Sequence, residues 1–183
     1  MALCNITSGA TLGCRDNVGG IESVFILSGS ITTITAASNE ITDISGTGTF
    51  FEFELPRNVG DFTETPNPSL ENGTLYFEQV VNIVIQKLQT SVRNQVNLLA
   101  LNPNLKMIVK TNNGTDDGVG QYFLVGRYRG MSVSAGTGAT GTAFGDANQY
   151  ALAFTGQEPQ PFFEVSTGGT GVLTDALTGI TVA

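Results

Sequence analysis

The chain has 183 residues, a length that suits one domain, or one domain with arms. It contains no His, which excludes a Ser-His-Asp triad, a Cys-His pair and a His-ligated metal. Eight Lys and Arg against sixteen Asp and Glu give a net charge of −8, which argues against affinity for nucleic-acid phosphates or for an anionic membrane.

The rest of the composition describes the surface. Charged residues make up 13% of the chain, about half of the roughly 25% that is usual in soluble domains. Gly, with 23 residues, is about twice as frequent as usual. The surface must therefore be built from Thr, Ser, Asn, Gln and Gly. This is typical of a β-rich protein with many turns, or of one largely covered by neighbours.

Residues 1–20 are polar and Gly-rich and are predicted to form an extended N-terminal arm. Its two cysteines, Cys4 and Cys14, are close enough in sequence for a local disulfide, but two Cys make no disulfide framework, so we expect them to be reduced. The chain opens without a signal-peptide pattern, and its longest apolar stretch, around 80–85, is too short to span a bilayer. We expect a soluble protein made in a cytosol, with no membrane partner.

The following segments have β patterns. Residues 21–36 are rich in β-branched residues and are interrupted at Gly29, which predicts a strand, a bend and more strand. A short strand is predicted at 40–44, a turn at 46–48, and a clear strand at 49–55. In this last strand two faces alternate, with Phe51, Phe53 and Leu55 toward a core and Phe50, Glu52 and Glu54 on the other side.

Residues 57–73 hold two Pro, two Gly, three Asn and three acids without an apolar period. We interpret them as a long mid-chain loop that projects and becomes ordered against a partner. Residues 74–88 are predicted to form a long strand that is partly apolar on both faces. A helix is the competing assignment, but the β-branched residues at 80–85 weaken it.

Residues 91–101 change to a helical period, with Ser91 as the predicted N-cap and Asn102-Pro103 as the end. Strands follow at four places, and residues 159–166 are expected to add an edge strand. The four are 104–111, 120–127, 129–135 and 148–155.

The predicted fold is mainly β: an antiparallel sandwich or barrel of about seven or eight strands with one flanking α-helix. We divide the chain into an N-terminal arm (1–20), a β domain (21–165) and a Gly/Thr-rich C-terminal extension (166–183).

Three sequence patterns are candidates for sites of chemistry. Residues 136–141 match GxGxxG, but a turn and a strand follow where a dinucleotide site needs a helix, so a hairpin loop fits better. Residues 112–117 are rich in oxygens but lack the Glu of an EF-hand, which favours a polar turn over a calcium site. Glu52 and Glu54 could pair as in a glycosidase, but on one strand face they more simply meet solvent or an acidic channel. We therefore predict no enzyme, cofactor or metal.

Charge is distributed unevenly. Residues 1–80 hold ten acids and two bases, whereas residues 81–183 hold six of each, so one face of the molecule is expected to be strongly acidic. Arg127 and Arg129 flank Tyr128 and alternate onto one face. They could hold the carboxylates of a neighbouring subunit, or form a cross-strand pair within the chain.

The order of these segments resembles that of bacteriophage tail tube proteins. It runs from ENGTLYFEQVVNIVIQKL through a helix to NLKMIVK, then to a strand containing YFLVG, a Gly-rich loop and a strand ending near FTGQEP. The opening CNITSGATLGCRDNVGGIESVFI is also similar to the start of phage structural proteins. The resemblance covers most of residues 1–165 and rests on order and short fragments, while 166–183 match nothing.

The resemblance implies a small β-barrel or sandwich that assembles into hexameric rings. Sheets of neighbouring subunits would join into one inner barrel, and rings would stack through loops and arms. The implied location is the tail of a virion assembled in the bacterial host cytoplasm. The implied partners are further copies of the chain, other tail proteins, and DNA that passes through the lumen without specific binding. An acidic wall would repel that DNA.

On this view the loop 57–73 contacts the next ring or the adjacent subunit, and the N-terminal arm is the second choice. The strands around 50–55 and 75–88 are candidates for the inner barrel. The named candidates are Arg57, Asp61, Glu64 and Glu71 in the loop, Glu52, Glu54 and Glu78 in the lumen, and Arg127 and Arg129 at a subunit contact.

Two other classes of protein stay open. The first is another virion part, namely a head–tail connector, a tail terminator or a capsid decoration protein, which would close a ring or sit on a capsid. The second is a carbohydrate-binding β-sandwich, which needs an exposed aromatic platform. The absence of Trp counts against it.

Overall fold

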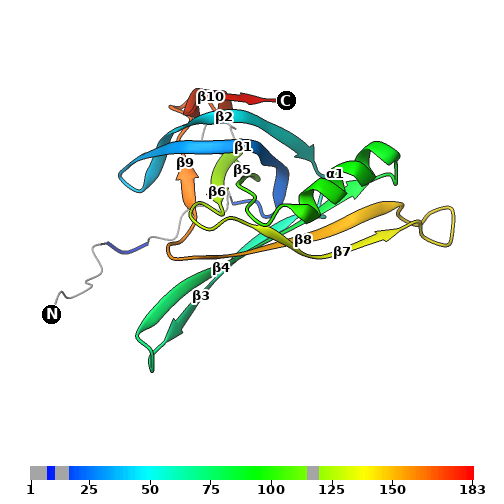
Figure 1. The fold of residues 1–183 in the computed structure, drawn as a ribbon, viewed down its shortest axis with the longest axis horizontal. Helices are drawn as coiled ribbons and strands as arrows, with labels where there is room; N and C mark the ends of the chain where they lie inside the picture. The colour runs from blue at the N-terminus through cyan, green and yellow to red at the C-terminus, as the bar shows by residue number, and fades with distance from the viewer. Residues whose placement is uncertain (1–7, 11–16, 115–119) are drawn as a thin grey trace.

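The computed structural model describes residues 8–10, 17–114 and 120–183 and confirms the mainly β fold class. A barrel lies over a second, four-stranded sheet, with one α-helix beside the junction (Figure 1). The described elements are β1 (Ile21–Ala37), β2 (Glu40–Glu54), β3 (Asp61–Ser69), β4 (Thr74–Gln86), α1 (Thr90–Leu101), β5 (Met107–Gly114), β6 (Gly120–Val125), β7 (Ser132–Ala139), β8 (Gln149–Glu158), β9 (Phe163–Val165), the 3-10 helix η1 (Leu173–Ala176) and β10 (Leu177–Val182). Cys4 and Cys14 lie outside the described residues.

Five strands form the barrel in the order β1-β5-β6-β9-β2, and pairing of β1 with β2 closes it. β10 adds to β2 in parallel. Apolar side chains fill the barrel, and their removal from water is its main source of stability. These are Phe25, Leu27, Ile41, Ile44, Phe50, Ile108, Tyr122, Leu124, Val165, Leu173, Ala176 and Ile180.

The β1–β2 hairpin turns at Ser38 and Asn39, whose φ angles of 53° and 68° suit a two-residue type I′ turn. The turn predicted at 46–48 is wrong, because β2 continues through it. Gly29 and Gly48 face each other across the ladder, and a Cβ on either residue would collide with the backbone of the other strand. These glycines allow two strands to approach closely, which the sequence alone does not distinguish from a turn.

The second sheet has the order β3-β4-β8-β7. Val81 and Ile83 of β4 and Leu152 and Phe154 of β8 pack against the barrel in a second apolar cluster. Alternation directs the intervening residues to the outer face of the sheet, which no described element covers.

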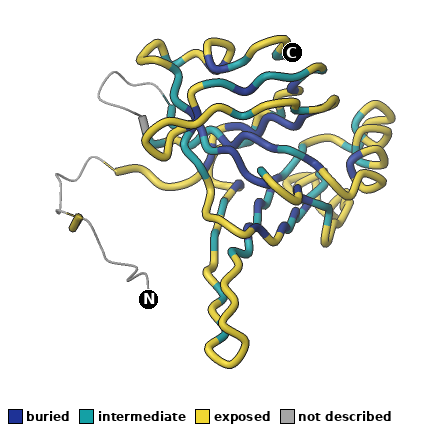
Figure 2. The backbone as a smooth tube through the Cα atoms, turned by 60° about the vertical axis from the view of Figure 1, so that its left-hand side comes forward, coloured by how far each residue is buried: buried dark blue, intermediate teal, exposed yellow. Residues whose placement is uncertain are grey.

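The loop predicted at 57–73 is wrong as a loop, although it does project. Nine residues of it form β3, paired in register with β4 from Asp61 opposite Asn82 to Ser69 opposite Thr74. The β3–β4 hairpin extends past the barrel as an exposed arm (Figure 2). Pairing with a long strand outweighs the poor strand propensity of Pro, Asn and Asp in this segment.

Helix α1 confirms the helical prediction, but Ser91 is not its N-cap. Gln89 occupies that position, without a side-chain hydrogen bond. Leu99 is the buried residue of the helix. Neither helix in the described part of the chain has the length and apolar character that crossing a membrane requires.

The C-terminal part joins the barrel more closely than expected. β9, predicted as an edge strand, lies between β6 and β2. Residues 166–183, expected as an extension, supply η1 and β10, and Leu173, Ala176 and Ile180 are buried in the barrel. This segment therefore belongs to the same packed unit as residues 21–165.

Candidate assembly surfaces

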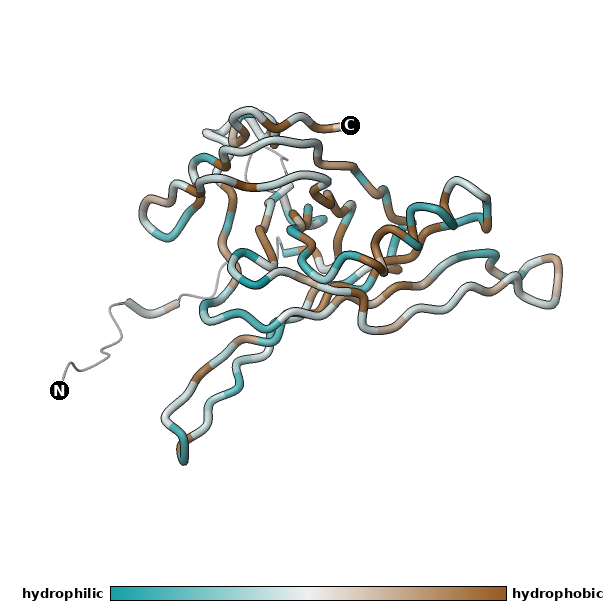
Figure 3. Tube along the Cα trace, viewed as in Figure 1, coloured by the Kyte–Doolittle hydropathy of each residue, from teal (hydrophilic) through white to brown (hydrophobic). Residues whose placement is uncertain are grey.

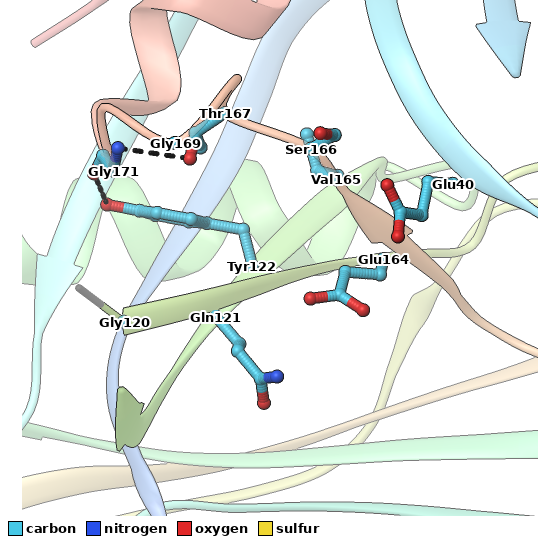
Figure 4. A pocket seen from close by; sticks show the side chains of 10 residues that line it. All are labelled: Glu40, Gly120, Gln121, Tyr122, Glu164, Val165, Ser166, Thr167, Gly169 and Gly171. Carbon is cyan, nitrogen blue, oxygen red and sulfur yellow. Dashed lines mark hydrogen bonds between the residues drawn. The ribbon is translucent and has the colours of Figure 1, made fainter. Parts of the chain in front are cut away.

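A hollow of about 160 Å³ lies beside β6 and β9 (Figure 4). Glu40 and Glu164 meet there, and burial together with repulsion from Glu40 raises the pKa of Glu164. The Tyr122 hydroxyl donates a hydrogen bond to the Gly171 carbonyl at 3.4 Å. In the part of the chain that the structure describes, acidic and Cys side chains form no group of three that could ligate a metal. We assign this hollow no chemistry.

The predicted contact residues of the β3–β4 hairpin divide into two kinds. Asp61 accepts hydrogen bonds from the Asn82 amide to both of its carboxylate oxygens, each at 3.1 Å. Glu64 accepts hydrogen bonds from the Gln79 amide at 2.9 Å and from the Phe162 N–H at 2.8 Å. Asp61 and Glu64 therefore brace the base of the hairpin. Arg57, which precedes the hairpin, and Glu71 at its tip are exposed, as is Asp61.

The tip of this hairpin carries Leu70, which is 99% exposed, directly before Glu71. The base is braced a second time by aromatic rings. Phe162 packs edge-on against Phe62 of β3 and Phe123 of β6, with ring centroids 5.3 and 4.9 Å apart. A leucine is thus held in water at the end of an arm that is fixed where it leaves the body.

Two buried polar side chains, which the sequence analysis missed, anchor the segment between β6 and β7. The side-chain carbonyl of Gln79 accepts a hydrogen bond from the backbone N–H of Gly126 at 2.9 Å. The Glu158 carboxylate, 1% exposed, accepts three backbone N–H groups. These are the N–H groups of Tyr128 at 2.9 Å, Arg129 at 2.8 Å and Gly130 at 3.0 Å. The sequence pattern could have identified both residues. Gln79 alternates in phase with Val81, and Glu158 with Phe154, so each polar side chain stands at a core-facing position of its strand.

Arg127 and Arg129 form no ion pair within the described residues, where Lys110–Glu22 at 2.8 Å is the one salt bridge. The Arg127 guanidinium stacks instead on Phe163, 4.3 Å from the ring centroid, and lies 5.0 Å from the ring centroid of Tyr128. Of the two arginines, Arg127 lines a surface hollow and Arg129 does not. The cross-strand pair within the chain is therefore not formed by these side chains.

The hollow beside Arg127 has a volume of about 480 Å³. Residues of β1, among them Ile31 and Ile34, line it together with Lys106 and Arg127. The Lys106 ammonium donates a hydrogen bond to the Gly126 carbonyl at 2.8 Å. Burial lowers the pKa of Lys106, and the negative charge of Glu158 opposes that shift. We call this site the basic hollow.

The three lumen candidates do not share a surface. Glu78 lies on the outer face of the second sheet, since its neighbour Gln79 faces the barrel. Glu52 and Glu54 lie near the end of β2 in the barrel sheet. The strands at 50–55 and 75–88, both candidates for the inner barrel, belong to different sheets of the single chain.

At that end of the barrel, Glu52 interacts with the charge of Lys110. Burial lowers the pKa of Lys110, but the hydrogen bond and charge of Glu22, helped by Tyr122 and Glu52, raise it overall. The carboxylate of Glu52 therefore acts on a cation of the same chain.

The β7–β8 hairpin is almost free of charge. Between Gly130 and Gln157 the one charged residue is Asp146, whose carboxylate accepts the N–H groups of Thr142 and Ala143, both at 2.7 Å. These backbone hydrogen bonds lower the pKa of Asp146. The tip presents Phe144, fully exposed, at the apolar end of the hairpin in Figure 3. The GxGxxG residues lie on β7 and its turn, as the hairpin interpretation predicted.

An apolar groove of about 120 Å³ separates α1 from the barrel. Phe51, 47% exposed, and Leu98, 59% exposed, stand in it. Phe51 was expected to face a core, and in this chain it is half open to water. Together with Leu70 and Phe144, these residues make the surface unusually apolar at separate points.

The chain matches no family model, no curated protein and no solved structure.

Proposed function

We propose that the chain is the structural subunit of a phage tail tube, which self-assembles into stacked hexameric rings around a DNA-conducting channel. One observation carries the proposal: within the described residues, the four-stranded sheet has an uncovered outer face and two unpaired edge strands. The resemblance of the sequence supports the hexamer and the tube, and the sheet supports how copies join.

The two edge strands of this sheet lie on opposite sides and differ in chemistry. An unpaired strand edge is a template for pairing, which monomeric proteins block with charges, Pro or covering elements. β7 carries no charge and no Pro. β3 contains Pro66 and Pro68, so only its first half, residues 61–65, offers an uninterrupted ladder. We infer that β7 of one copy joins this half of β3 in the next.

Such a contact uses two different surfaces, which makes it heterologous. Heterologous contacts close into a ring when the rotation allows it, and otherwise they continue as an open filament. Ring closure also removes both free edges at once, as barrels do. This property suits a subunit of a closed ring.

The outer face of the sheet then lines the channel. The four strands contain no Lys or Arg, and their outer face carries the acidic residues Asp61 and Glu78 among Thr, Gln, Asn, Val and Ala. Repetition of these carboxylates around a ring creates a negative wall that repels DNA and lets it pass unbound. Glu78 keeps its assignment to the lumen. We do not assign Glu52 and Glu54 to it, because they lie on the barrel sheet.

Negative-stain electron microscopy of the purified protein, beside light scattering for mass, tests the proposal. Long hollow tubes with a six-fold end view are the expected result. Closed rings that do not stack would favour a tail terminator or a head–tail connector. A chain that stays a 19.2 kDa monomer at high concentration would contradict the proposal and favour a decoration or binding module.

A further inference from the structure

The tip of the β3–β4 hairpin has the features of an anchor that needs a partner. Leu70 is 99% exposed, and Glu71 beside it carries the charge of the tip. The hairpin leaves the body at an angle and points away from the barrel in both views (Figures 1 and 2). Because Glu64, Gln79 and Phe162 fix its base, the arm is held in place before any contact forms.

The basic hollow has the complementary features. Lys106 and Arg127 supply two cations, and no acidic side chain lines it. Glu158, whose negative charge acts on Lys106, is buried and already accepts three backbone N–H groups. Arg127 is held by its stacking on Phe163, so its donors lose little freedom on pairing. Ile31 and Ile34 add an apolar wall.

The charges decide which tip fits this hollow. The chain has eight bases against sixteen acids, and two of those bases meet in the basic hollow. The β7–β8 tip is neutral apart from Asp146, whose carboxylate is turned inward onto its own backbone. The β3–β4 tip therefore matches by both its charge and its leucine. It points away from its own barrel, so it must reach a second molecule.

We propose that Leu70 and Glu71 of one copy seat in the basic hollow of another copy. Leu70 packs against Ile31 and Ile34, and the Glu71 carboxylate pairs with Arg127 and Lys106. This contact deepens the proposed function and rests on it, since the partner is a second copy of the chain. It is heterologous and is distinct from the side-by-side joining of strand edges, so it suits the link between stacked rings.

A charge swap tests the contact. Glu71→Lys and Arg127→Glu are each expected to raise the protein concentration needed for assembly by about tenfold or more, because close charge pairs at an interface couple strongly. The double variant E71K/R127E is expected to recover most of that loss. Arg129→Glu is the matched control, as it changes the same loop but does not line the hollow. Light scattering and electron microscopy measure assembly, and thermal melts check folding.

The outcomes separate this contact from the proposed function. Single variants that assemble like the wild type, or a folded double variant that recovers nothing, would overturn the contact and leave the tube standing. If Arg127→Glu fails to fold, Leu70→Ser at the exposed tip takes its place and should also weaken assembly, while unchanged assembly would overturn the contact. A wild-type chain that never self-associates would contradict the proposed function, and this contact with it.

Discussion

The two hairpins of the second sheet, β3–β4 and β7–β8, share one architecture and differ in chemistry. Both extend past the barrel, and both end in a fully exposed apolar residue, Leu70 or Phe144. The β3–β4 hairpin carries acids along its length and two prolines on its edge strand. The β7–β8 hairpin carries one charge, and its edge strand is made of small uncharged residues.

This difference shows how a chain with two free edges can avoid joining wrongly. Two equally open edges would allow copies to pair in several registers and directions. Prolines on β3 shorten the available ladder at one edge, whereas β7 stays open over its full length. The acidic hairpin is suited to a charged partner surface and the neutral hairpin to backbone pairing. The following predictions test this division.

The largest expected effect concerns the bases of the hairpins. Glu158→Ala removes a buried carboxylate and leaves three backbone N–H groups, the one of Gly130 buried, without their acceptor, so it should lower the free energy of unfolding by about 3 kcal/mol. Glu64→Ala, at the base of the β3–β4 hairpin, removes two hydrogen bonds at a less buried site and should cost about 1 kcal/mol. Urea denaturation measures both, with the exposed neighbour Gln157→Ala as control. Equal losses for the two glutamates would contradict the assignment of Glu158 as the deeper anchor.

The second-largest effect is expected at the edge strands of the four-stranded sheet. Thr137→Lys places a charge on the outer face of β7 and should reduce assembly about tenfold, or about 1.4 kcal/mol. Thr74→Lys introduces the same change on the same face of the sheet, in the part of the β3–β4 hairpin beyond the prolines, and should change assembly little. Sedimentation velocity at matched concentrations compares the two variants. A stronger effect at Thr74 than at Thr137 would reverse the roles of the two edges.

The neutral tip should have a smaller effect on assembly and none on folding. Phe144→Ser removes a side chain that lies in water, so the free energy of unfolding should stay within about 0.5 kcal/mol of the wild type. Assembly should weaken a few-fold, because we expect the tube to cover this tip. Leu101→Ser, an exposed leucine on α1, is the matched control. Unchanged assembly in Phe144→Ser would leave strand pairing as the sole role of this hairpin.

The smallest expected effect is the pH response of the β7–β8 turn. Hydrogen bonds from Ala143 and Thr142 lower the pKa of Asp146, so its stabilising effect is present above the unfolded-state pKa and is lost as pH falls through the lower folded-state pKa. Hydrogen exchange of the amides at 142 and 143 should therefore show weaker protection in acid. Asp146→Ala should show that weaker protection at neutral pH as well, with no further change in acid. Protection independent of pH in the wild type would exclude this role.

Much of the fold follows from local pattern. The strand at 74–88, the helix at 91–101 and the hairpin around 136–141 were predictable from alternation, helical period and turn residues. The segment 57–73 was not, since its Pro and Asn residues disfavour a strand that only pairing with β4 makes stable. The same holds for 166–183, whose Gly and Thr residues do not predict the strand that pairs with β2 at the edge of the sheet.

The surfaces divide in a similar way. The acidic character of the first half, the single charge in residues 130–157 and the absence of His were all determined by the sequence itself. Only the tertiary structure decided that Glu78 and Glu52 lie on different sheets, that Glu64 and Glu158 are used inside the chain, and that Arg127 and Lys106 share a hollow. The reason is physical: composition and alternation are local properties, whereas strand pairing joins residues far apart in the chain and determines which side chains meet.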